Sequence, residues 1–163
     1  MKGSTLKRLV VAAALTAGIA GTAIAGPPWI AIEYPVNPHN PNTRNAFVTV
    51  RTYHHGELVS YGISGTAEGL VNGQRQTMKL DIRRLPEPGM FAVYWKKPAQ
   101  GTWALLITSS QDNHFMASAL IQVDNAGRVA SVSVPSDTIE NGRWLVPRRV
   151  ATTEVDAILR RSN

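Results

Sequence analysis

The sequence of 163 residues contains no cysteine and few charged residues. The lack of cysteine excludes disulfide bonds and a lipid-modified cysteine, so the fold must be stabilised by burial alone. Charged residues make up 17% of the chain and hydrophobic residues 44%. These values exclude an intrinsically disordered chain and a coiled coil, because both need far more charge. The length predicts one domain with a hydrophobic core of its own.

The first 25 residues have the pattern of a secretory signal peptide. Three cations lie within residues 1–8, an apolar run follows over residues 9–24, and Ala23-Ile24-Ala25 predicts cleavage before Gly26. The apolar run is shorter than the roughly 20 residues that a membrane-spanning helix needs, although an uncleaved anchor is the alternative. We therefore predict an exported, soluble protein, periplasmic or secreted, that is not a lipoprotein and has no transmembrane segment after cleavage.

Removal of the signal peptide changes the charge of the protein. The whole chain carries +6 at pH 7, whereas the remaining 138 residues hold 14 basic and 11 acidic side chains and carry +3. The strongest indication of an acidic partner is thus lost with the signal peptide. A domain of this length buries roughly two-thirds of its unfolded surface, which is enough for stability without disulfides.

The mature sequence divides into three predicted segments. Residues 26–45 are rich in Pro and Asn, and they predict an edge strand followed by a long loop. Residues 46–146 are predicted to form a β-sandwich domain. Residues 147–163 are predicted to form a C-terminal segment with a short helix, since Val155, Ile158 and Leu159 have the spacing of one helical face.

Strand-length segments follow one another through the central region with turn signals between them. The predicted strands cover residues 46–53, 58–63, 76–83, 90–95, 102–108, 115–123 and 129–134. Gly56 is expected to adopt a positive φ in the first hairpin. The fold class that we predict is all-β, an immunoglobulin-like antiparallel β-sandwich of about seven to nine strands with a short C-terminal helix.

Two predictions about these strands are specific. Residues 76–83 alternate between apolar and polar side chains, which predicts one strand with Met78, Leu80 and Ile82 on its buried face. The segments at 90–95 and 102–108 are expected to pair as an aromatic-rich hairpin.

The sequence over 88–95 and 98–107 resembles the paired strands of bacterial extracytoplasmic immunoglobulin-like domains, including the YtkA-like and FixH-like group. In these domains a Pro-Gly-x-aromatic strand is followed by a Gly-Thr-Trp strand, as it is here. The resemblance implies that Phe91, Trp95 and Trp103 fill the space between two sheets. It also implies a location in the cell envelope, and it implies no activity.

Histidine and methionine are the candidate metal ligands. The four histidines are His39, His54, His55 and His114, and Met78, Met90 or Met116 would supply thioethers. Imidazole and thioether together suit copper, and imidazole suits zinc. However, neighbouring residues on a strand point to opposite faces, so His54 and His55 can chelate together only if the turn rotates both inward. A copper- or zinc-handling protein is therefore the alternative hypothesis, and we predict no cofactor.

Signals for catalysis are weak. Residues 62–66 approximate a nucleophile elbow, but the second Gly comes one residue too early for that motif. Asp112 and His114 have the chemistry of an acid and a base, although a turn between strands explains this segment equally well. A small secreted hydrolase is the third hypothesis, and we predict that the protein is not an enzyme.

Cations and a tryptophan gather near the C-terminus. Arg143, Arg148 and Arg149 flank Trp144, and with Trp29 these are the candidate partner-binding residues, with a solvated surface and core packing as the alternatives. Export argues against nucleic acid and favours an envelope protein or an anionic envelope polymer. The sequence thus predicts an exported, non-catalytic binding or interaction module whose ligand it does not name.

Overall fold

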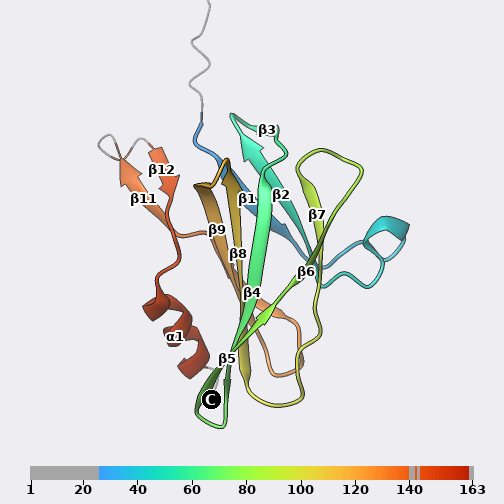
Figure 1. The fold of residues 1–163 in the computed structure, drawn as a ribbon, viewed down its shortest axis with the longest axis vertical. Helices are drawn as coiled ribbons and strands as arrows, with labels where there is room; N and C mark the ends of the chain where they lie inside the picture. The colour runs from blue at the N-terminus through green and yellow to red at the C-terminus, as the bar shows by residue number, and fades with distance from the viewer. Residues whose placement is uncertain (1–25, 140–141, 143, 162–163) are drawn as a thin grey trace, which may run out of the picture.

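The computed structural model describes residues 26–139, 142 and 144–161 (Figure 1). The predicted signal peptide, residues 1–25, and Arg143 lie outside the described residues. Two antiparallel sheets make up most of the fold, and one helix follows at its C-terminal end (Figure 1). The prediction of an all-β sandwich with a short C-terminal helix is confirmed.

Sheet A has the strand order β1-β2-β7-β6, and β3 pairs with β2. Its strands are β1 (Trp29–Glu33), β2 (Val48–His54), β3 (Glu57–Leu58), β6 (Asp81–Arg84) and β7 (Met90–Tyr94). A 3-10 turn, η1 (Pro41–Thr43), lies in the loop between β1 and β2. This part confirms the predicted N-terminal edge strand and the loop that follows it.

Sheet B has the order β10-β9-β8-β4-β5. Its strands are β4 (Gly62–Val71), β5 (Gln74–Lys79), β8 (Thr102–Gln111), β9 (His114–Val123) and β10 (Val129–Ser133). A separate hairpin pairs β11 (Ser136–Ile139) with β12 (Trp144–Pro147), and α1 (Thr152–Arg161) follows. The described residues thus form twelve strands, more than the predicted seven to nine, because several are only two to five residues long.

The core lies between the two sheets. Strand β8 contributes Trp103, Leu105 and Ile107, and they pack against Val50 of β2 and Phe91 of β7. The ring centroids of Trp95 and Trp103 are 6.1 Å apart. The aromatic side chains therefore fill the space between the sheets, as expected from the sequence.

The predicted single strand over 76–83 is wrong. β5 ends at Lys79 and pairs with β4 in sheet B, whereas β6 begins at Asp81 and pairs with β7 in sheet A. Leu80, between them, is 4% exposed, but Met78 is 43% exposed. All six residues of β5 are exposed, so the face that carries Met78 is not covered by a second layer.

The predicted hairpin of 90–95 with 102–108 is also wrong. β7 pairs with β2 and β6, whereas β8 pairs with β4 and β9, so the two segments lie in different sheets. The predicted strand over 58–63 is divided in the same way, since β3 ends at Leu58 in sheet A and β4 begins at Gly62 in sheet B. In the segments 58–63 and 76–83 the alternating pattern continues while the chain crosses between sheets.

The helix α1 covers part of the outer face of sheet B. Val155 and Leu159 are buried against Ala104 of β8 and Leu120 of β9. The predicted apolar face of the helix is therefore confirmed. Gly56 has a φ of 82°, which confirms its predicted role in the β2–β3 turn. Within the part of the chain that the structure describes, no helix has the length and apolar character to cross a membrane.

Candidate functional site

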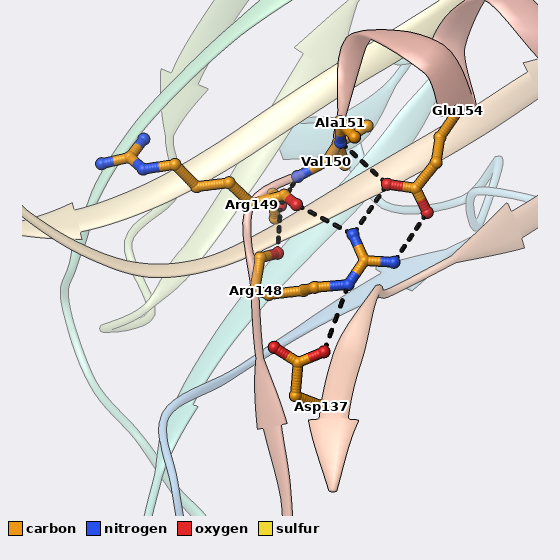
Figure 2. Close-up of polar contacts among 7 residues, drawn as sticks. Asp137, Arg148, Arg149, Val150, Ala151 and Glu154 are labelled. Carbon is orange, nitrogen blue, oxygen red and sulfur yellow. Dashed lines mark hydrogen bonds and ion pairs between the residues drawn. The ribbon is translucent and has the colours of Figure 1, made fainter.

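Arg148, a candidate partner-binding residue, is held by contacts inside the protein (Figure 2). Its guanidinium donates to the two carboxylate oxygens of Glu154 at 2.7 and 2.9 Å and to the Arg149 carbonyl at 3.0 Å. A carboxylate oxygen of Asp137 lies 3.5 Å from its Nε. The residue therefore ties the β11–β12 hairpin to α1, and its charge is largely satisfied without a partner.

The other candidate partner residues lie on different elements. The Arg149 side chain extends away from the Arg148 guanidinium (Figure 2), and its Cζ lies 4.7 Å from the centre of the Phe115 ring. Trp144 is half-buried in β12, and Trp29 is half-buried at the start of the edge strand β1. Arg143 is outside the described residues. The sequence cluster is thus divided among a loop, a hairpin and a sheet edge.

The turn after β2 brings two of the candidate metal ligands together. His55 has a φ of 55°, and the His54 and His55 ring centroids are 4.0 Å apart. The expectation that adjacent strand residues diverge fails here because His55 belongs to the turn and has a left-handed conformation. His39 and His114 are exposed in other segments. Among residues 26–139, 142 and 144–161, no three His, Asp or Glu side chains gather as a metal site would require.

A hollow on the outer face of sheet B is a feature that sequence reasoning missed. It has a volume of about 460 Å³. We call it the hydroxyl trough, and its lining residues are Ser64, Gly65, Thr66, Thr77, Lys79, Leu106 and Thr108. These residues come from β4, β5 and β8, three neighbouring strands of one sheet.

The strand register explains how these side chains meet. Ser64 lies directly opposite Thr108 of β8, and Thr66 lies opposite Leu106 on one side and Lys79 on the other. Residues that are opposite in an antiparallel pair share a face of the sheet. The hydroxyl trough is therefore built by three polar strand faces with Leu106 as the apolar residue among them.

The polar groups of the hydroxyl trough differ in their availability. The hydroxyls of Thr66 and Thr77 donate to the Glu68 carboxylate at 2.7 and 2.9 Å. By contrast, the hydroxyls of Ser64 and Thr108 and the ammonium of Lys79 make no hydrogen bond or ion pair with the described part of the chain. Two hydroxyls and one positive charge thus remain free to bind a ligand.

A second hollow, of about 180 Å³, adjoins the trough at Leu106. It is lined by Glu68, Arg75, Leu106, Val150, Thr152 and Val155. Arg75 donates to Asp156 of α1 at 2.6 Å and to Glu68 of β4 at 3.3 Å, which bridges the helix and the sheet. The helix and the segment before it therefore form one wall of an extended depression.

The sequence held one signal for this site. Ser64, Thr66 and Thr108 alternate with core residues on their strands, but the same alternation describes any solvated strand face. The backbone also shows that residues 62–66 are not a nucleophile elbow, because Ser64 lies inside β4 and no strand-to-helix turn follows it. The pairing of β4 with β8 and β5 is what converts scattered hydroxyls into one site.

No protein-family model, curated protein or solved structure matches this chain. The resemblance to extracytoplasmic immunoglobulin-like domains therefore stays a prediction from the sequence.

Proposed function

We propose that the protein is an exported, non-catalytic binding module of the cell envelope, and that its ligand occupies the hydroxyl trough. The observation that carries the proposal is a hollow of about 460 Å³ at which the Ser64 and Thr108 hydroxyls and the Lys79 ammonium are free of internal partners. Binding sites typically combine a concave surface with a few unsatisfied polar groups. The signal-peptide pattern and the family resemblance support export and an envelope location.

The chemistry of the lining favours binding over catalysis. A hydroxyl becomes a nucleophile only when a general base lies within hydrogen-bond reach. The free hydroxyls of Ser64 and Thr108 make no hydrogen bond to a His, Asp or Glu side chain in the described part of the chain. The carboxylate of Glu68, a residue that lines the second hollow, already accepts hydrogen bonds from Thr66 and Thr77.

The shape and charge of the site favour an anionic, oxygen-rich polymer. The trough and the second hollow beside α1 share Leu106 as a lining residue, so a linear chain could reach from one into the other. Lys79 supplies a positive charge for an anionic group, and the hydroxyls of Ser64 and Thr108 can donate to or accept from ligand oxygens. A polymer of this class agrees with the anionic envelope polymer that the sequence predicts as a partner of an exported protein.

Removal of the Lys79 charge tests the proposal. Binding of polygalacturonate, an anionic polysaccharide, and of dextran, a neutral one, is measured by calorimetry for the protein and for Lys79→Gln. We expect the protein to bind polygalacturonate more tightly than dextran. Lys79→Gln should weaken the binding of polygalacturonate by about tenfold, which is the effect of losing one charge-assisted contact. Lys96→Gln is the matched control, because Lys96 is exposed and lies outside the trough. Equal losses of affinity in Lys79→Gln and Lys96→Gln would show non-specific charge attraction and would contradict the proposed site.

A second candidate function is copper or zinc binding at His54 and His55. The turn that places the two rings 4.0 Å apart supports it, since imidazole is a ligand of both metals. Titration with Zn²⁺ while the imidazole resonances are followed by NMR tests this function. We expect His54 and His55 to respond before His39 and His114. If none of the four imidazole resonances changes at stoichiometric Zn²⁺, this candidate function is excluded.

A further inference from the structure

The loop between β1 and β2 covers part of the outer face of sheet A. Thr49 and Arg51 alternate along β2 with Val48 and Val50, which lie in the core, so their side chains belong to the outer face. Thr49 is nevertheless only 3% exposed, and Thr43 in the loop is 2% exposed. The loop therefore covers this part of the sheet, and a polar side chain from each, Thr43 of the loop and Thr49 of β2, is buried there.

A pocket of about 240 Å³ remains between this loop and the sheet. We call it the loop pocket, and it is lined by Glu33, Pro35, Val36, Asn37, Asn40, Thr43, Thr49, Arg51 and Met90. Pockets for drug-sized ligands start at about 300 Å³, so this volume suits a smaller molecule. The loop pocket and the hydroxyl trough lie on the outer faces of different sheets.

The asparagines in the lining present donors. The Asn37 side-chain oxygen accepts the His39 backbone N–H at 2.9 Å, and the Asn40 side-chain oxygen accepts the Asn42 backbone N–H at 3.0 Å. Each amide therefore uses its acceptor inside the loop and keeps its NH₂ group for another partner. An NH₂ group binds carboxylate or carbonyl oxygens.

Two opposite charges lie side by side at the same pocket. The guanidinium of Arg51 is 3.0 Å from the Glu33 carboxylate, which also accepts the Thr49 hydroxyl at 2.7 Å. Both charged side chains remain partly exposed, at 35% for Arg51 and 50% for Glu33. Each charge can therefore still attract a ligand group.

We propose that the loop pocket binds a small zwitterion in which a carboxylate and an ammonium are adjacent, namely a free α-amino acid with a short apolar side chain. The carboxylate would meet Arg51 and the amides of Asn37 and Asn40, while the ammonium would meet Glu33. A simple anion would be repelled by Glu33, and a simple cation would be repelled by Arg51. The apolar residues that line the pocket and can contact the ligand side chain are Pro35, Val36 and Met90.

Three related probes test the proposal on the unmodified protein. L-Alanine, N-acetyl-L-alanine and L-alanine methyl ester are titrated while the side-chain NH₂ resonances of Asn37 and Asn40 are followed by NMR. We expect L-alanine to shift both resonances. The N-acetyl compound lacks the ammonium and the ester lacks the carboxylate. Each should therefore bind at least about tenfold more weakly than L-alanine. Equal binding of all three probes, or no shift with L-alanine at millimolar concentration, would overturn the proposal.

A charge variant adds a reciprocal test. In Glu33→Gln the repulsion of anions is removed, so the preference for L-alanine over N-acetyl-L-alanine should fall by about tenfold. Glu57→Gln is the matched control, since Glu57 is exposed in β3 and outside the loop pocket. An unchanged preference in Glu33→Gln would contradict the assigned role of Glu33. If that variant does not fold, the comparison of the three probes on the unmodified protein still decides.

Discussion

The guanidinium of Arg148 holds the carboxylate of Glu154 through two hydrogen bonds of 2.7 and 2.9 Å (Figure 2). The same carboxylate accepts the Ala151 backbone N–H at 2.8 Å, one residue before α1 begins. Hydrogen bonding by Arg148, followed by that from Ala151, lowers the pKa of Glu154 from its ordinary 4.5 to about 2. The pair therefore fixes the start of the helix that walls the second hollow.

This lowered pKa predicts how stability depends on pH. Because the folded-state pKa of Glu154 is depressed, its contribution is complete above pH 4.5 and is lost as the pH falls from 4.5 towards 2. The Glu154 side chain is 33% exposed, so solvent screening limits the contribution to about 1 kcal/mol. Urea unfolding between pH 2 and 7 should show Glu154→Gln less stable than the unchanged protein at pH 7 and equal to it near pH 2. Glu87→Gln, a change at an exposed turn, should follow the unchanged protein throughout.

Gly69 has no space for a larger side chain. A Cβ placed on Gly69 would lie 2.7 Å from the ring of Trp103, which is fully buried and donates its indole N–H to the Gln100 carbonyl at 2.8 Å. Because the ring is fully buried and its N–H is held by this hydrogen bond, Gly69→Ala should lower the free energy of unfolding by about 1 to 3 kcal/mol. Gly62→Ala is the control in the same strand, as its nearest contact is an ordinary 3.4 Å. Equal unfolding midpoints for the two variants would contradict the packing described.

The division between β5 and β6 can be tested by two neighbouring truncations. Leu80→Ala removes a core side chain and should cost about 2 to 5 kcal/mol of unfolding free energy. Met78→Ala changes a side chain that is exposed on an edge strand, so the loss should stay within about 0.5 kcal/mol. Similar losses in both variants, measured by urea unfolding, would mean that Met78 and Leu80 share one buried face.

Ser118 joins sheet B to the segment that precedes α1. Its buried hydroxyl donates to the Arg148 carbonyl at 3.0 Å and accepts the Val150 N–H at 3.2 Å. Ser118→Ala leaves both backbone groups without their partner and should cost about 1 to 3 kcal/mol. Ser133→Ala, at an exposed position of β10, should be nearly neutral in the same unfolding measurement. A neutral result for Ser118→Ala would show that water replaces the hydroxyl.

Local patterns in the sequence were sufficient where the deciding interactions are local. The spacing of Val155 and Leu159 predicted the buried face of α1, and Gly56 marked a turn that needs a positive φ. The alternating segments predicted an all-β sandwich, because alternation is the direct consequence of a strand with one buried face. These features depend on residues within a few positions of one another.

The tertiary structure alone decided which strands pair and which side chains meet. Alternation over 76–83 is the same whether the chain stays in one sheet or crosses at Leu80, since the pattern records burial and not the identity of the neighbour. For the same reason Ser64, Thr108 and Lys79 become one site only through strand register. Strand pairing depends on contacts between residues far apart in the sequence, whereas composition, capping and periodicity report only what lies nearby.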